Sequence, residues 1–253
     1  MKKCFLFIFI FTSFTLLAKQ TKLVVRVKAK DAKFIGSSLG GAYIIIRDKV
    51  TNKILAEGKT SGSTGNTDLI MNVPAKRGIS IADEQTAKFL AIIDIDEPTF
   101  ISIEAISPLN NKQAQVKAST ELWLIPGKDI LGDGITIEIP GFIIDILEPR
   151  THHYISLKSV KDKAFKIKSN IVMMCGCVIN ESGVWKASDI EVTGILKKDG
   201  MYMKDVKLSL IETNLFEGNT LIEATGNYEL IVYAYNSKSG NTGVDKVNFV
   251  INE

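Results

Sequence analysis

The side chains best suited to chemistry gather in one stretch of this chain, residues 152–203. Thiolate and thioether sulfur atoms are soft ligands that select Cu(I), and imidazole joins thiolates in many zinc sites. A copper or zinc site in this stretch is therefore one hypothesis for the chain. Its candidate ligands are His152, His153, Met173, Cys175, Cys177, Met201 and Met203.

Strand geometry sets how these ligands would meet. Side chains alternate along a strand, so Met173, Cys175 and Cys177 would project from one face. Met201 and Met203 would share a face in the same way, and the sulfur atoms would converge if the two strands lie side by side. Adjacent residues of a strand point to opposite faces, so only one of His152 and His153 can join the site. We expect the other histidine at the junction of two domains.

The two cysteines also have structural explanations. Paired cysteines of an exported protein are usually oxidised, and methionine on a strand often fills a core. In a straight strand the Cα atoms of Cys175 and Cys177 would lie about 6.5–7 Å apart, at the limit for a disulfide. Gly176 between them would permit a bend. A local disulfide, a metal site and buried free thiols all remain open.

The first 18 residues have the pattern of a secretory signal peptide. Lys2 and Lys3 precede an apolar run over residues 5–11, and the small residue Ala18 marks a cleavage site. We expect an exported chain, periplasmic or extracellular, with no transmembrane segment after residue 18. Cleavage removes two lysines and no acid, which lowers the formal net charge from +3 to +1.

Alternating apolar and polar residues recur from Thr21 to the C-terminus and predict an all-β protein. The expected strands include residues 68–73 and 135–146, and the one expected helical turn covers residues 79–86. A proline-containing break at residues 147–150 separates two runs of strands. We therefore predict two tandem β-sandwich domains, residues 19–149 and 150–253, after the signal peptide at residues 1–18.

Both runs of strands resemble known modules. Residues 40–46 (Gly-Gly-Ala-Tyr-Ile-Ile-Ile) and 51–58 (Thr-Asn-Lys-Ile-Leu-Ala-Glu-Gly) are similar to the opening hairpins of transthyretin-like or carboxypeptidase-regulatory-like modules of bacterial exported proteins. Residues 226–235 (Gly-Asn-Tyr-Glu-Leu-Ile-Val-Tyr-Ala-Tyr) resemble bacterial immunoglobulin-like modules. The resemblance implies binding or scaffolding, because such modules usually have these roles, and the resembling residues carry no catalytic motif.

Several motifs that suggest other functions lack a required part. The Gly-Lys-Thr at residues 58–60 has Lys53 where a phosphate-binding loop needs glycine. A serine hydrolase would need a histidine base, and His152 and His153 are the only histidines. An enzyme of unidentified type is therefore the last of our hypotheses.

Basic residues do not form the concentrated face of a nucleic-acid-binding protein. The one local run comprises Lys158, Lys161, Lys163, Lys166 and Lys168. We interpret this run as a solvated strand face or hairpin in preference to an anion-binding stripe.

The sequence favours an exported bacterial protein that binds an unknown protein or surface ligand and is not an enzyme. The alternative is a periplasmic or secreted protein that handles Cu(I) or zinc. Trp123 and Trp185 are expected as core or interface anchors.

Overall fold

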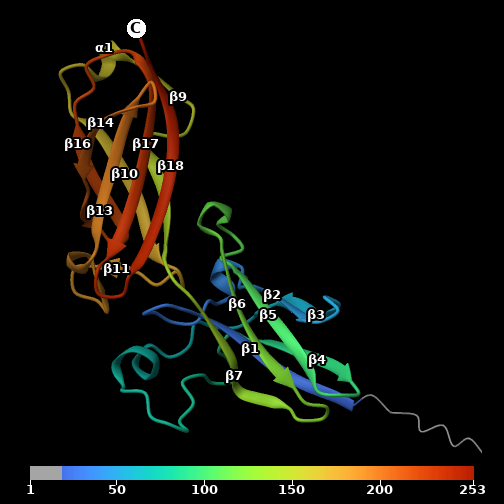
Figure 1. The fold of residues 1–253 in the computed structure, drawn as a ribbon. Coiled ribbons are helices and arrows are strands. Elements are labelled where there is room, and N and C mark those ends of the chain that lie inside the picture. Colours follow the sequence, from blue (N-terminus) through green and yellow to red (C-terminus); the bar gives the residue numbers. More distant parts are fainter. Residues whose placement is uncertain (1–18) are drawn as a thin grey trace, which may run out of the picture.

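The computed structural model describes residues 19–253, and the predicted signal peptide lies outside the described residues. Strands dominate this part of the chain, and the prediction of an all-β protein is confirmed. Figure 1 shows the strands gathered in two units, one carrying β1 to β7 and the other most of the later strands. Among residues 19–253, no helix is long and apolar enough to cross a bilayer.

The first unit contains two sheets, ordered β4-β1-β7 and β3-β2-β5-β6. β1 pairs antiparallel with β4 and parallel with β7. The strands are β1 (Lys19–Ala29), β2 (Tyr43–Asp48), β3 (Ile54–Lys59), β4 (Phe89–Ile95), β5 (Thr99–Ser107), β6 (Val116–Leu124) and β7 (Ile130–Ile139).

The second unit contains sheets ordered β15-β16-β10-β8 and β14-β13-β17-β18-β9, with a small pair β11-β12. Its strands are β8 (Phe142–Glu148), β9 (His153–Ser156), β10 (Phe165–Met173), β11 (Ile179–Asn180), β12 (Trp185–Lys186), β13 (Glu191–Lys198), β14 (Met201–Lys207), β15 (Ser209–Glu212), β16 (Leu215–Thr220), β17 (Gly226–Asn236) and β18 (Asn241–Asn252).

Alternation along the strands produces the core, as the sequence pattern predicts. On β17, Tyr228, Leu230 and Val232 are buried while the residues between them are partly exposed. Ile101 and Ile103 of β5 are buried in the first unit in the same way. Each large apolar side chain buried in this manner stabilises the fold by about 1.5–3 kcal/mol.

Helical structure is limited to single turns. These are η1 (Ser37–Leu39), η2 (Asp68–Asn72), η3 (Lys112–Ala114), α1 (Leu157–Val160) and η4 (Ala187–Asp189). The expected strand at residues 68–73 is wrong, because η2 is a π-helical turn there. Asn66 caps this turn by accepting a hydrogen bond from the Leu69 amide at 3.1 Å. Residues 79–86, where we expected a helical turn, contain no helix.

The chain passes from the first unit to the second at Pro140-Gly141. β7 pairs with β1, whereas β8 pairs with β10. The single strand expected over residues 135–146 is therefore two strands in different sheets. The boundary predicted at residues 149/150 falls after β8.

Candidate functional site

A tight turn at the end of β10 carries both cysteines. Cys175 and Cys177 form a disulfide, with Cα atoms 5.3 Å apart. Gly176 adopts φ +74°, and its amide donates to the Met173 carbonyl at 2.7 Å. The Met173 amide in turn donates to the Cys177 carbonyl at 3.1 Å. The backbone thus makes the bend that brings the two sulfur atoms together, and of the three open alternatives the structure has the disulfide.

This turn is buried where the two units meet. The exposed fraction is 2% for Met173, 1% for Cys175 and 8% for Cys177. A Cβ added at Gly176 would lie 3.3 Å from the Leu39 side chain of the first unit. The cysteine turn therefore packs as part of the junction and is closed to solvent.

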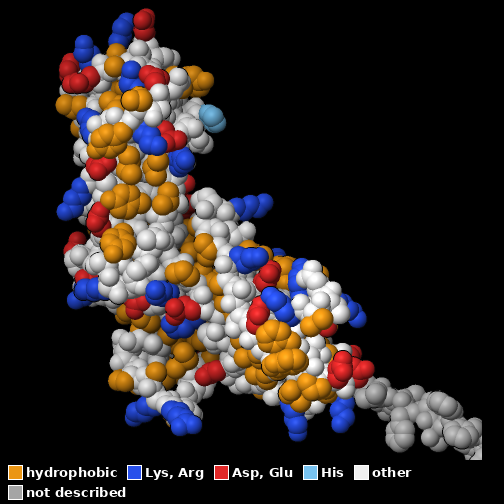
Figure 2. All heavy atoms as spheres, in the orientation of Figure 1, with side chains coloured by type: hydrophobic (Ala, Val, Ile, Leu, Met, Phe, Trp, Pro, Cys, Tyr) orange, Lys and Arg blue, Asp and Glu red, His pale blue; other side chains and the backbone are white. Residues whose placement is uncertain are grey.

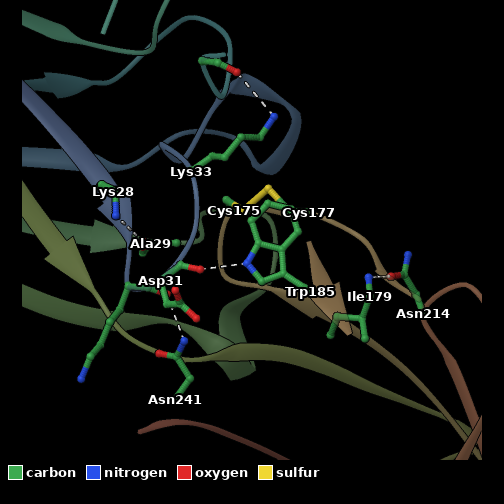
Figure 3. Close-up of a disulfide and its surroundings, with 12 residues drawn as sticks. Lys28, Ala29, Asp31, Lys33, Cys175, Cys177, Ile179, Trp185, Asn214 and Asn241 are labelled. Carbon is green, nitrogen blue, oxygen red and sulfur yellow. Dashed lines mark hydrogen bonds between the residues drawn. A yellow bond between two sulfur atoms is a disulfide. The ribbon is translucent and has the colours of Figure 1, made fainter. Parts of the chain in front are cut away.

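Two further contacts join the units near the disulfide (Figure 3). Nε1 of Trp185 donates a hydrogen bond to the Asp31 carbonyl at 2.8 Å. Asn241, which is fully buried, donates to the Lys30 carbonyl at 3.0 Å and accepts from the Gly141 amide at 2.9 Å. Trp185 is thus an interface anchor within the chain, whereas nothing in the sequence pattern singled out Asn241.

The structure does not bring Met201 and Met203 to the cysteines. β14 pairs with β13 in one sheet, and β10 pairs with β8 and β16 in another. Met201 is 73% exposed and Met203 is 38% exposed, whereas Met173 is buried. The expectation that the two methionine-bearing strands lie side by side is therefore wrong. Two strands with the same alternation of apolar and polar residues can join different sheets. The local sequence pattern does not show which sheet each strand joins.

The histidines lie at the opposite end of the second unit from the cysteine turn. β18 runs from Asn241 at the junction toward Phe249, which pairs with His153. His152 has φ +53°, and its amide donates to the Asn248 carbonyl at 2.7 Å. Figure 2 shows a histidine on the outer part of the second unit, away from the first. The expectation of a histidine at the domain junction is wrong, because β8 carries the chain away from the junction before the histidines begin.

Metal binding stays a prediction. Within residues 19–253, no group of three or more histidine, cysteine, aspartate or glutamate side chains is placed to hold a metal ion. Copper or zinc bound near Met173 would need Cys175 and Cys177 in their reduced form, because a disulfide sulfur is not a thiolate.

An aromatic pair lies at the surface of the first unit, with Phe100 half-buried and Trp123 exposed. Phe100 of β5 and Trp123 of β6 are cross-strand partners with ring centroids 5.1 Å apart. Trp123 is 61% exposed. On the same face Glu121 forms an ion pair with Lys49. Figure 2 shows hydrophobic side chains gathered on this unit over β5 and β6.

A buried arginine holds the loop before β4 against β1. Arg26 is 3% exposed and donates hydrogen bonds to the carbonyls of Ala87 and Gly132, each at 3.2 Å. Burial lowers the pKa of Arg26, and the nearby carboxylate of Asp133 opposes that effect. The hydrogen bond from the Thr86 hydroxyl lowers the pKa of Asp83, which lies in the same loop.

The sequence matches no protein-family profile and no curated protein. A structure of Clostridium thermocellum CbhA fibronectin(III)-like modules aligns with 92% of this chain and 93% of its own, at 11% identity and a TM-score of 0.29. An ectodomain fragment of ICAM-5 aligns with 93% of this chain and 50% of its own, at 11% identity and a TM-score of 0.27.

Proposed function

We propose that this chain is an exported bacterial binding protein without enzymatic activity, and that its partner docks on Phe100 and Trp123. The single observation that carries the proposal is the 61% exposure of Trp123 beside Phe100 on an ordered sheet face. Large aromatic side chains bury much apolar area at little cost in side-chain entropy, and they dominate the binding energy of many interfaces.

The surroundings of the aromatic pair resemble a small interface. The Lys49–Glu121 ion pair lies next to the rings, so an apolar centre has a charged border. Both rings extend from adjacent strands, which hold them rigidly before any partner arrives. A rigid platform loses little conformational freedom on binding.

The export part of the proposal rests on the pattern of residues 1–18. Fractionation of the producing cells, with N-terminal sequencing of the mature chain, tests it. We expect a chain that begins close to Lys19, outside the cytoplasm. A cytoplasmic chain that retains Met1 would overturn this part alone.

Partner binding is tested by replacing both rings. We expect Phe100→Thr with Trp123→Thr to weaken capture of the partner by at least about tenfold, as for interface hot spots. Tyr202→Thr is the matched control, because Tyr202 is an aromatic residue that is 63% exposed on β14 of the second unit. Thermal unfolding of each variant shows that the fold is intact. Equal capture by the folded double variant and the control would contradict the proposal.

A further inference from the structure

A groove of about 490 Å³ lies at the end of the second unit farthest from the cysteine turn. Its walls come from the end of β8, from β9, from α1 and from the start of β10. This volume is within the range of ligand-binding pockets, about 300–1,000 Å³. The aromatic pair is in the first unit, so this groove is a separate surface.

Apolar side chains line much of the groove. Leu147 is 45% exposed, Ile155 and Val160 are half-buried, and Phe165 closes the base with 6% exposure. Leu147 lies at an irregularity in the pairing of β8 with β10, between Ile146, which pairs with Ser169, and Glu148, which pairs with Lys168. The groove therefore offers apolar surface that a ligand can cover.

Positive charge surrounds this apolar surface. Arg150, Lys163 and Lys166 line the groove together with a single acid, Glu148. Lys166 is paired with Glu217 at 3.4 Å, but neither Arg150 nor Lys163 forms an ion pair with any residue in the described range 19–253. Part of the lysine run interpreted from the sequence as a solvated face thus borders a concave apolar site, which favours an anionic ligand.

Two strand edges face the same groove. The pairing of β8 with β10 ends at Glu148, which lies opposite Lys168. Residues 165–167 of β10 therefore extend beyond β8 and pair only with β16. β9 is the last strand of its sheet and pairs only with β18. Free strand edges bind extended peptides by adding a strand, with side-chain pockets supplying specificity.

From these features together we propose that the groove binds an extended peptide segment of a partner protein in which acidic and apolar residues alternate. The apolar residues contact Leu147 and Phe165, and the acidic residues pair with Arg150 and Lys163. The peptide backbone hydrogen-bonds to the open edge of β10 or β9. The four residues of β9 give an edge about 13 Å long, enough for a short segment.

Fluorescence anisotropy tests the proposal with a labelled peptide, Glu-Val-Asp-Leu-Glu-Val-Asp. We expect it to bind the full chain at least tenfold more tightly than two control peptides. One control has the same composition in blocks, Glu-Glu-Asp-Asp-Val-Val-Leu, and the other is basic, Lys-Val-Lys-Leu-Lys-Val-Lys. Equal binding of the block peptide, or no binding of the alternating peptide, overturns the proposal.

Charge reversal at the groove locates the site. We expect Arg150→Glu with Lys163→Glu to weaken binding at least tenfold, and Lys158→Glu with Lys161→Glu to weaken it less than threefold. The second pair makes the same charge change in exposed residues that do not line the groove. Equal losses from the two pairs would show general charge attraction and overturn the site.

Two further experiments test the charged contacts and the strand pairing separately. Arg150→Gln with Lys163→Gln, checked by circular dichroism, should also weaken binding if the reversal variant does not fold. Two peptides carry N-methyl groups on alternate amides, one in each of the two possible registers. The peptide whose methylated amides face the strand edge should lose binding, because those amides can no longer donate hydrogen bonds to it. Unchanged binding of both N-methylated peptides overturns strand addition.

The occupant of the groove could also be a second copy of this chain. If the chain self-associates and the pair Arg150→Glu with Lys163→Glu abolishes this self-association, the occupant is a second copy, and the proposal of a separate partner protein is overturned.

Discussion

Nε1 of Trp185 donates a hydrogen bond to the carbonyl of Asp31 at 2.8 Å, and this contact ties the second unit to a turn of the first. The cysteine turn packs against Leu39 in the same region, and Asn241 adds two more hydrogen bonds. The residues that carried the chemical hypothesis therefore serve, in part, to join the two units. The surfaces left for a partner are elsewhere.

Asn241→Ala should destabilise the protein by about 2–3 kcal/mol. The substitution removes two hydrogen bonds and leaves the Gly141 amide and the Lys30 carbonyl without their partner. Urea unfolding monitored by fluorescence measures the change. Asn219→Ala is the control, because Asn219 is exposed, and we expect a change within about 0.5 kcal/mol. Equal effects of the two substitutions would contradict the role given to Asn241.

Freshly purified mature protein should contain no free thiol. Alkylation followed by intact mass measurement should modify Cys175 and Cys177 only after reduction. Reduction should lower the free energy of unfolding by only about 1–2 kcal/mol, because the closed loop is very short. Two thiols alkylated without reductant would show that the disulfide is absent.

Any Cu(I) bound by the reduced protein should depend on the cysteines and not on the exposed methionines. We expect Cys175→Ser with Cys177→Ser to abolish bound copper. Met201→Leu with Met203→Leu should leave it unchanged, because β14 lies in a different sheet from β10. Elemental analysis after anaerobic loading measures both. Absence of stoichiometric copper or zinc in the reduced wild-type chain would remove the metal hypothesis.

Asp83→Asn should reduce the dependence of stability on acid pH. Hydrogen bonds from Thr86 hold the folded-state pKa of Asp83 below its usual value of about 3.9. A lowered pKa stabilises the folded state above the unfolded-state pKa, and this stabilisation is lost as the pH falls through the folded-state pKa. Thermal unfolding from pH 6 to pH 2 should therefore show a smaller decline for the variant. If the unfolding temperatures of the wild type and the variant fall equally with pH, Asp83 does not contribute to the acid dependence of stability.

The strand pattern of the sequence predicted the fold class because alternation reports burial locally. β17 from Tyr228 to Ala234 and β5 from Ile101 to Ser107 follow the expected alternation. The partner of each strand is set by contacts between distant residues, such as Asn241 with Gly141 and Lys30, and local alternation carries no record of them. For this reason the pattern did not predict that the strands carrying Met173 and Met203 join different sheets.

The two candidate surfaces were only partly visible in the sequence. Trp123 was expected as a core or interface anchor, and its exposure follows from its place on the outer face of the sheet, opposite to the face that carries the buried Leu124. The lysine run was visible, but the groove beside it exists because β8 ends opposite Lys168 and leaves residues 165–167 at the start of β10 uncovered. How far one strand extends beyond its neighbour can be determined only when the register of their pairing is known.

The most direct test of partner binding through the aromatic pair is photo-crosslinking in the cells that produce the protein. Trp123 is replaced by p-benzoylphenylalanine, and Ser119, an exposed residue on the same face of the same strand, is replaced in a matched control. The proposed function predicts one specific adduct from position 123 that is absent or much weaker from position 119. No adduct from position 123, or equal adducts from both positions, would contradict it.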